Sequence, residues 1–348
     1  MSTALNDACQ LENQNVVSLT PLPSPADLHR RLPLAAEAGI FVARSRAAVA
    51  NILAGRDPRA LVVVGPCSIH DLAAGREYLA RLRELAAALA ERVFIVMRVY
   101  FEKPRTTTGW KGLINDPRLD DSFDIESGLT LARSFLVELA EAGMPAATEA
   151  LDPIVPQYLG DLISWYAIGA RTTESQTHRE MASGLSAPCG FKNGTDGSVT
   201  IAVQAMQAAR TAHHFLGIDG QGRTAVVRTR GNADVHLILR GGREPNYEAA
   251  QVEAAVAELG AAGLPTAVMV DCSHGNSAKN PARQPLVARA VMAQRVAGRQ
   301  GIVGLMLESH LEAGNQPLVR EALRYGVSIT DACMGWAETE ALLRELFG

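Results

Sequence analysis

Residues 266–277 read TAVMVDCSHGNS, an apolar run that ends in an acid, a thiol, a hydroxyl and an imidazole before a glycine. A short apolar run bounded by turn-forming residues is typical of a strand that is buried on both faces in a parallel sheet. Catalytic side chains gather where such strands meet their loops. His274 is therefore the first candidate for a metal ligand or an acid–base group, although a single histidine at a strand end is more often structural.

The rest of the chain repeats this pattern of apolar runs separated by amphipathic helical segments such as GREYLARLRELAAALAERV. Alternating β and α segments indicate a parallel sheet, and eight of them in about 250 residues predict an α/β fold, a (β/α)8 TIM barrel. An open doubly wound sheet is the alternative, but no GxGxxG motif opens a helix after the first run. The predicted strands are Leu61–Val64, Val93–Val99, Pro145–Leu151, Trp165–Ala170, Pro188–Phe191, His236–Leu239, Thr266–Val270 and Ile302–Leu307.

The residues before the first strand form an N-terminal extension. Ser24 followed by Pro25 predicts the start of a short helix, and residues 37–54 predict a second helix that Gly55 closes. We therefore expect an N-terminal arm and helix in residues 1–55, with an oligomeric or regulatory role, and a catalytic barrel in residues 56–348. The start of the arm is either a disordered tail or a segment that docks on a neighbouring subunit.

Two insertions interrupt the regular spacing of the barrel. The first is the polar stretch 100–128 after the second strand. The second is TAVVRTRGNA at 224–233, whose alternating pattern and Gly231-Asn232 pair predict a β-hairpin before the sixth strand. Long loops in compact domains are usually functional, so the first insertion is a candidate part of the site.

The composition limits the classes of partner and the compartment. The 348 residues are 47% hydrophobic and 20% charged with a net charge of −4, which gives no electrostatic case for binding nucleic acid or an acidic membrane. The first twenty residues lack a cationic, apolar leader, and no run approaches the roughly 20 apolar residues that span a bilayer. Five scattered cysteines predict free thiols or metal ligands. We expect a cytoplasmic protein whose partners are small molecules.

Groups that bind metals or anions stand at or just after nearly every predicted strand. Because parallel barrel strands end on one face, these groups should converge there. Three of them, together with an aspartate that follows one helix later in SITDACMG, offer a sulfur, a nitrogen and two carboxylates, a set that suits divalent Mn, Fe, Co or Zn at a catalytic site. This predicted metal set is Cys67, His274, Glu308 and Asp331. Taken singly, each of them is as easily a core or salt-bridged residue, and only the quartet favours a metal.

A second set at the strand ends is cationic. Four cations in one barrel mouth would repel one another unless an anion neutralised them. At the low dielectric of a buried site this repulsion is on the order of several kcal/mol. Carboxylate and phosphate groups match arginine forks and lysine point charges, so a small, multiply charged ligand is expected. Salt bridges to carboxylates on the flanking helices are the alternative. The set comprises Arg98, Arg171, Lys192 and Arg240.

The loop YFEKPRTTTGWKGLINDP at 100–117 adds Lys103, Arg105 and Thr106 over the same mouth. Only four of the 33 basic residues are lysines, and this loop contains two of them. We interpret the loop as a second phosphate-binding element. Glu149, at the end of the third predicted strand, also falls in the substrate-binding set.

These residues lie in motifs that resemble the microbial, feedback-regulated type I 3-deoxy-D-arabino-heptulosonate 7-phosphate (DAHP) synthases, which catalyse the first step of the shikimate pathway. The resemblance runs from about residue 20 to the end of the chain. The motifs are VVVGPCSIHD, MRVYFEKPRTTTGWKGLINDP, GARTTESQTHRE, GFKNGTDGS, ILRGG, VDCSHGNSAKN, LMLESHLEAGNQ and SITDACMGW.

The resemblance implies a metal-dependent, aldol-like condensation of phosphoenolpyruvate with D-erythrose 4-phosphate and water, which releases phosphate. By position in the motifs, Cys67, His274, Glu308 and Asp331 match the family's metal ligands, and the four strand-end cations match its phosphoenolpyruvate-binding residues. Lys103, Arg105 and Thr106 match the residues around erythrose 4-phosphate. Lys103, His274 and Asp331 are the residues implied to act in catalysis, and we leave open whether Lys103 or His274 donates the proton to the new hydroxyl.

The resemblance also implies feedback inhibition by an aromatic amino acid, in a pocket that another subunit's N-terminal arm approaches. We predict tyrosine as the effector because Gly217 stands where phenylalanine-sensitive members tend to carry serine, and its missing side chain leaves room for a phenolic hydroxyl. A homodimer or homotetramer is expected. The pocket residues implied are Pro156, Gln157, Ser186, Phe215 and Gly217.

Two other functions remain as alternatives. A related synthase condenses phosphoenolpyruvate with arabinose 5-phosphate, but it lacks the KPRTT loop and the N-terminal arm. A non-catalytic barrel that senses phosphosugars is the other alternative, and the intact metal and cation sets argue against it.

Overall fold

All eight predicted strands are present in one closed parallel barrel. The computed structural model describes residues 11–348, so residues 1–10 of the expected arm lie outside the described part. The barrel strands are β1 (Ala60–Gly65), β2 (Val93–Arg98), β3 (Ala146–Glu149), β4 (Ile163–Ile168), β5 (Cys189–Lys192), β8 (Val235–Leu239), β9 (Val268–Asp271) and β10 (Ile302–Glu308). They pair in the order β1-β10-β9-β8-β5-β4-β3-β2. The predicted TIM barrel is confirmed, and the open sheet is excluded.

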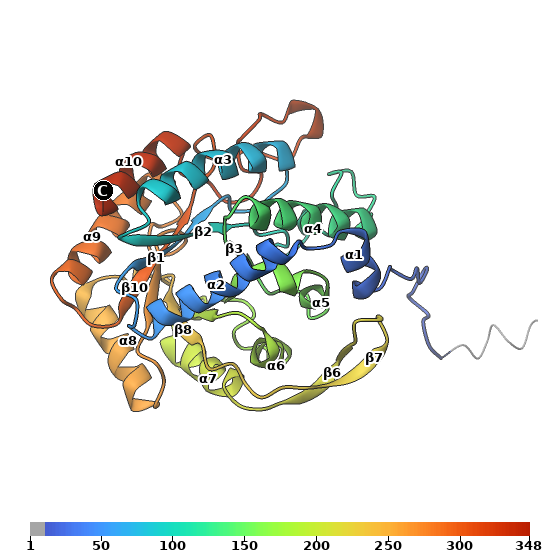
Figure 1. The fold of residues 1–348 in the computed structure, drawn as a ribbon, viewed down its shortest axis with the longest axis horizontal. Helices are drawn as coiled ribbons and strands as arrows, with labels where there is room; N and C mark the ends of the chain where they lie inside the picture. Colours follow the sequence, from blue (N-terminus) through green and yellow to red (C-terminus); the bar gives the residue numbers. More distant parts are fainter. Residues whose placement is uncertain (1–10) are drawn as a thin grey trace, which may run out of the picture.

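Helices surround this barrel, as the alternating pattern predicted (Figure 1). The predicted second helix at residues 37–54 corresponds to α2, and the serine-capped start at Ser24 corresponds to α1. The α-helices are α1 (Pro25–Arg31), α2 (Ala36–Leu53), α3 (Leu72–Ala88), α4 (Ile125–Glu141), α5 (Val155–Leu159), α6 (Gln176–Gly184), α7 (Val199–Ala209), α8 (Ala249–Ala261), α9 (Gln284–Val296) and α10 (Trp336–Phe347). Short 3-10 helices lie at η2 (Gly160–Leu162), η3 (Pro281–Arg283) and η4 (Arg320–Ala322).

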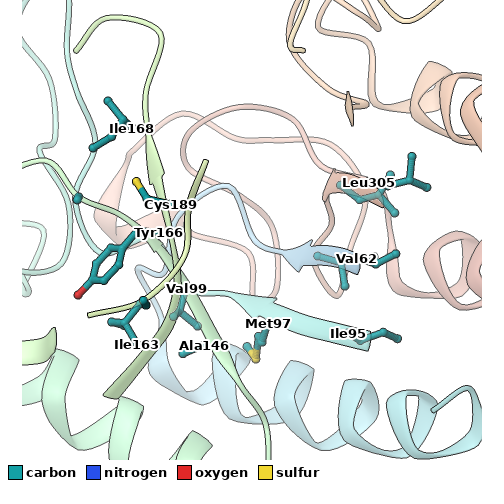
Figure 2. Close-up of a cluster of buried hydrophobic side chains, with 14 of the residues drawn as sticks. Val62, Ile95, Met97, Val99, Ala146, Ile163, Tyr166, Ile168, Cys189 and Leu305 are labelled. Carbon is teal, nitrogen blue, oxygen red and sulfur yellow. The ribbon is translucent and has the colours of Figure 1, made fainter. Parts of the chain in front are cut away.

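Successive strand residues face opposite sides of the barrel wall, and both sides are buried, which is why the strands are mostly apolar up to their last residues. Val62, Ile95 and Leu305 belong to the large layer between strands and helices, part of which Figure 2 shows. Leu61 and Val63 belong instead to the cluster inside the barrel. The interior is therefore filled with side chains, as in other barrels of this class, and cannot serve as a channel.

Helix α2 closes the end of the barrel where the strands begin. Its Val49 and Ile52 pack into the interior cluster. Its Arg46 donates from Nε to the carbonyl of Ile163, the first residue of β4, at 2.9 Å, and also to the carbonyl of Gly160. Helix α2 therefore covers this end, and the rim where the strands end lies opposite it.

The inserted hairpin exists, but its predicted position was partly wrong. Strands β6 (His214–Ile218) and β7 (Thr224–Arg228) pair antiparallel, with Gly217 opposite Ala225. The connecting turn spans 219–223, where Asp219 Oδ1 accepts from the backbone N–H groups of Gln221 and Arg223. Gly231 and Asn232, which we took as the turn, lie after the hairpin. The Asn232 side chain is buried and donates to the carbonyl of Ala187, so this pair anchors the chain before β8.

The hairpin turn meets the start of α1. Ser24 caps α1 by accepting from the N–H of Asp27, and Ala26 N donates to the Gly220 carbonyl at 2.8 Å. The segment before the barrel is thereby fixed to the hairpin from residue 24 onward. None of the helices in residues 11–348 has the length and apolar character needed to cross a membrane.

Candidate active site

The predicted strand-end residues gather at the open rim of the barrel. Four of them are the last residues of their strands, and the other four follow within three residues. The first group is Arg98, Glu149, Lys192 and Glu308, and the second is Cys67, Arg171, Arg240 and His274. The alternation of β and α segments was therefore enough to predict which residues share one face.

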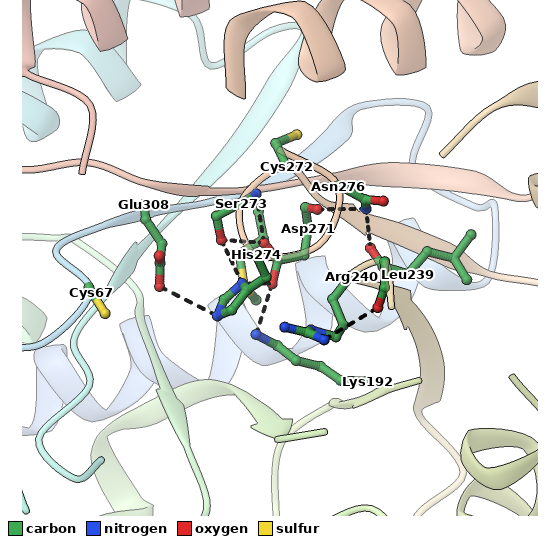
Figure 3. A network of polar contacts seen from close by, with 12 residues as sticks. Cys67, Lys192, Leu239, Arg240, Asp271, Cys272, Ser273, His274, Asn276 and Glu308 are labelled. Atoms are coloured by element: carbon green, nitrogen blue, oxygen red, sulfur yellow. Dashed lines mark hydrogen bonds and ion pairs between the residues drawn. The ribbon is translucent and has the colours of Figure 1, made fainter. Parts of the chain in front are cut away.

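Three of the four predicted metal ligands come together directly. Ligand atoms of Cys67, Glu308 and Asp331 all lie within 4.8 Å of one another. His274, the fourth, places its Nε2 4.0 Å from Glu308 Oε1 (Figure 3). Zn–N and Zn–O bonds are each about 2 Å, so the two atoms would have to approach by a few tenths of an ångström to bind one ion at a tetrahedral angle. A thiolate, an imidazole and two carboxylates form a donor set that fits a divalent transition metal.

The Cys67 thiol lies at the bottom of this cluster and is fully buried. Burial, together with the adjacent Glu308 carboxylate, raises the pKa of the Cys67 thiol. Lys103 Nζ donates to Cys67 Sγ at 3.1 Å and to its carbonyl at 3.2 Å. Because a metal binds the thiolate, an ion entering this site would displace the thiol proton, and Lys103 stands beside the sulfur.

Arg98 is committed to the wall of the site. Its guanidinium is 1% exposed and donates to Glu308 Oε1 at 2.9 Å and to the carbonyls of Pro66 and Cys67. It also lies 3.6 Å from the centre of the Tyr100 ring. Arg98 therefore holds Glu308 in place and neutralises it, which modifies our expectation that the strand-end cations are balanced by ligand alone.

Asp271 is a functional residue that we did not assign from the sequence. It is the last residue of β9, is fully buried, and its Oδ2 accepts from Lys192 Nζ at 2.8 Å. Burial alone would raise the pKa of the Asp271 carboxyl, but the contacts with His274 and Lys192 outweigh it and hold the pKa well below its usual range. The signal was present in the sequence, since an acid that ends a fully apolar strand must be paired.

The turn after β9 holds His274 in an uncommon backbone conformation. His274 has φ 54°, in the left-handed region, where a residue with a Cβ is strained by an amount on the order of 1 kcal/mol. Asn276 supports the turn, because its buried Nδ2 donates to the carbonyls of Leu239 at 3.1 Å and Asp271 at 2.9 Å. This conformation turns the imidazole back toward the end of β10.

A pocket opens beside the metal-ligand cluster. Seven cationic side chains line it, against the carboxylates of Glu149 and Asp331. Arg98 and Lys192 are paired internally, so the excess positive charge comes mainly from the others. The cations are Arg98, Lys103, Arg105, Arg171, Lys192, Arg240 and Lys279. Such a lining favours a ligand that carries several negative charges.

The loop residues divide between the pocket and the surface. Lys103 and Arg105 line the pocket, and Arg105 Nε donates to the Trp110 carbonyl at 2.7 Å, which closes the loop on itself. Thr106 is exposed and is not among the lining residues. Glu149 lines the pocket with an Oε1 that is buried and has no hydrogen-bond partner.

The predicted effector residues meet at a second pocket, between the barrel and the hairpin. Pro156, Gln157, Ser186 and Phe215 all line it. Gly217 is not a lining residue, but it follows Phe215 by two positions on β6 and a Cβ there would point at the lining residue Val227. Asp161 supplies a carboxylate, and Arg133 fixes it with a pair of 2.8 Å hydrogen bonds.

The fold and the site together define an enzyme of the (β/α)8 class, with an anion-binding pocket beside a set of metal-ligating side chains. A family model described as the DAHP synthetase I family matches residues 33–344. This chain belongs to that family, and the predicted resemblance and class of enzyme are confirmed.

Named relatives match over nearly the full length. The Tyr-sensitive phospho-2-dehydro-3-deoxyheptonate aldolase of Escherichia coli (strain K12) is 56% identical, over 97% of this chain and 95% of that protein. The Phe-sensitive protein of the same strain is 53% identical, over 97% of both chains. The solved structure of phospho-2-dehydro-3-deoxyheptonate aldolase from Francisella tularensis SCHU S4 superposes with a TM-score of 0.93 at 48% identity, covering 95% of this chain and 97% of that one.

Proposed function

We propose that this protein condenses phosphoenolpyruvate with D-erythrose 4-phosphate and water to give 3-deoxy-D-arabino-heptulosonate 7-phosphate and inorganic phosphate. The observation that carries the proposal is the cationic pocket directly beside the Cys67, His274, Glu308 and Asp331 cluster. Two phosphorylated substrates need several cations to bind them. The aldehyde of one substrate also needs a Lewis acid, such as a metal ion, close to both substrates to activate it.

The four clustered residues would hold a divalent ion, for which Mn, Fe, Co and Zn are the candidates. Cysteine among the ligands argues against Mg²⁺ and Ca²⁺, which prefer oxygen alone. When bound, such an ion supplies Lewis-acid polarisation of a carbonyl oxygen.

The cations divide between the two substrates. Lys192 contacts Asp271, and Arg171 and Arg240 line the same pocket. We assign these three, with Arg98 in the pocket wall, to the phosphate and carboxylate of phosphoenolpyruvate. Lys103 and Arg105 come from the loop above and would hold erythrose 4-phosphate, with Thr106 at its edge. Holding both anions in one orientation converts a bimolecular encounter into an intramolecular step.

The bonds then change as follows. C3 of phosphoenolpyruvate attacks the aldehyde carbon, the carbon–carbon bond forms, and the aldehyde oxygen takes up a proton. Water adds at C2, and the C2–oxygen bond to phosphate breaks. Both candidates line the pocket, and we assign the proton donation to Lys103, because its ammonium is a donor at the sulfur of Cys67, whereas His274 Nδ1 faces Asp271 and its Nε2 faces the metal-ligand cluster. Asp331, exposed at the rim, is placed to accept a proton from water.

One assay separates the proposal from its alternatives. Purified protein with Mn²⁺ and both substrates should release inorganic phosphate and consume phosphoenolpyruvate in equal amounts. Arabinose 5-phosphate in place of erythrose 4-phosphate should give no reaction. Reaction only with arabinose 5-phosphate would favour the related synthase, and binding of both ligands without phosphate release would favour a phosphosugar sensor.

The second pocket is proposed as the feedback site, with tyrosine as the effector. Its wall combines apolar side chains for an aromatic ring, among them Met181, Leu185 and Phe215, with the Asp161 carboxylate for an ammonium group. The Tyr-sensitive relative is also somewhat more similar to this chain than the Phe-sensitive one.

We also propose a homodimer or homotetramer in which residues 1–55 serve the oligomer and its regulation, in a protein of the cytoplasm. The hairpin leaves Leu216 80% and Val226 63% exposed, and in the arm Val17 and Leu19 are exposed. Burying these side chains against a second copy would remove apolar surface from water. Sedimentation analysis of the full chain and of a chain that lacks residues 1–20 tests this part.

A further inference from the structure

Asp271 connects a cation that is assigned to phosphoenolpyruvate with an imidazole that is assigned to the metal (Figure 3). Its Oδ2 lies 2.8 Å from Lys192 Nζ and 2.9 Å from His274 Nδ1. Its Oδ1 accepts from the Ser273 hydroxyl at 2.7 Å and from the Ser273 N–H at 3.0 Å. Both carboxylate oxygens are thus fully used inside the protein, and the residue has no contact with solvent.

These contacts decide which nitrogen of His274 carries the hydrogen. A carboxylate paired with a lysine can only accept hydrogen bonds. The single hydroxyl hydrogen of Ser273 goes to Asp271, so the Ser273 oxygen, 2.6 Å from His274 Nδ1, can only accept from the ring. Nδ1 therefore faces two acceptors and must be the protonated nitrogen.

In the neutral imidazole, the other ring nitrogen then carries the lone pair, and it points at the metal-ligand cluster. His274 Nε2 lies 4.0 Å from Glu308 Oε1, which is itself an acceptor. An imidazole in the opposite tautomer would aim an N–H at that carboxylate and could not bind a metal through Nε2.

We propose that Asp271 is the positioning residue that fixes His274 in the Nδ1–H tautomer for metal binding and aligns Lys192 for the phosphoenolpyruvate anion. One buried carboxylate thereby sets the geometry of both halves of the site. This inference rests on the proposed function, in which His274 and Lys192 have those ligands.

The test uses two variants of the full chain, Asp271→Asn and, as the matched control, Ser273→Ala. Asparagine keeps the shape of the side chain but presents an N–H₂ group to Lys192 or His274. Alanine removes one acceptor at Nδ1 and leaves the carboxylate in place. Thermal unfolding checks that each variant is folded.

The first readout is the two-bond ¹H–¹⁵N spectrum of metal-free protein labelled on histidine, with the His274 signal assigned by its loss in His274→Asn. The wild-type chain and Ser273→Ala should show the Nδ1–H tautomer, and Asp271→Asn should shift toward Nε2–H. A wild-type chain with the hydrogen on Nε2 would overturn the proposal, even if Asp271→Asn failed to fold.

The second readout is binding. Asp271→Asn should bind Mn²⁺ about 10- to 100-fold more weakly, the usual effect of losing a residue that orients a metal ligand. It should also bind phosphoenolpyruvate more weakly in metal-free protein, and Ser273→Ala should stay within about threefold of wild type for both ligands. A folded Asp271→Asn with wild-type tautomer and affinities would refute the inference and leave the proposed function intact. Failure of the proposed function would instead show as no turnover by the wild-type chain.

Discussion

Replacing Gly217 with serine is expected to weaken inhibition by tyrosine. Gly217 lies on β6 opposite Ala225, and a Cβ at this position would stand 2.7 Å from Cγ2 of Val227 and 4.0 Å from the Phe215 ring. Phe215 and Val227 both line the proposed effector pocket. The new side chain would therefore compete for space with the wall of that pocket.

The size of the effect follows from this contact. Carbon atoms in ordinary contact lie about 3.4 Å or more apart, so the Val227 methyl must move by roughly 0.7 Å. Displacement of this lining methyl toward the effector would remove about one methylene of pocket space. A misfit of that size is worth about 1–3 kcal/mol, which corresponds to a rise of about 5- to 150-fold in the half-inhibitory concentration of tyrosine.

The assay is phosphate release by wild type, Gly217→Ser and a control variant, titrated with tyrosine, phenylalanine and tryptophan. Gly220→Ser is the matched control, because a Cβ at Gly220 in the hairpin turn meets nothing within 4 Å. The control should keep wild-type inhibition to within about twofold. Unchanged tyrosine inhibition in Gly217→Ser, or a wild-type preference for phenylalanine or tryptophan, would refute the reasoning.

Three further predictions concern the catalytic site and the core. Cys67→Ser should bind Mn²⁺ at least about tenfold more weakly than the wild-type chain. Treatment of the wild-type chain with a chelator should abolish phosphate release until Mn²⁺ is restored. Full activity without metal would contradict the assigned metal-ligand cluster. Arg105→Ala should raise KM for erythrose 4-phosphate by about tenfold or more and leave KM for phosphoenolpyruvate nearly unchanged, so an equal rise in both would remove Arg105 from its assigned role. His236 is fully buried in the barrel, which lowers the pKa of its imidazole to about 3, whereas the unfolded chain titrates near 6.5. As pH drops below 6.5, the unfolded state takes up a proton at this histidine before the folded state does, so the free energy of unfolding should fall, by about 2 kcal/mol at pH 5 from this residue. His236→Gln should make the free energy of unfolding, measured with urea, less dependent on pH between 6.5 and 5. An unchanged pH dependence would argue against a neutral buried imidazole.

The sequence by itself determined that the chain forms a barrel and which side chains lie at the rim where its strands end. A run such as Thr266–Val270 predicts a strand, and leads into β9, because β-branched residues in a short apolar stretch suit a pleated, doubly buried surface, and that preference is local. Eight such runs alternating with helices leave few ways to pack other than a closed parallel sheet, which brings strand-end residues such as Cys67 and Glu308 to one face. The strand-end side chains of both predicted sets were recognisable for that reason, before any coordinates.

The tertiary structure decided which of these groups contact one another. Arg98 pairs with Glu308 across 210 residues of sequence, and Lys192 pairs with Asp271 across 79. Likewise, only the tertiary structure brings His274 Nε2 to Glu308 at the end of β10 and the hairpin turn to the start of α1. Periodicity along the chain fixes the face of a strand on which a residue lies. Whether two rim side chains come within hydrogen-bonding distance depends instead on the strand register and the loop conformations. Both are set by the packing of the whole barrel, and a difference of a few tenths of an ångström is enough to lose the hydrogen bond.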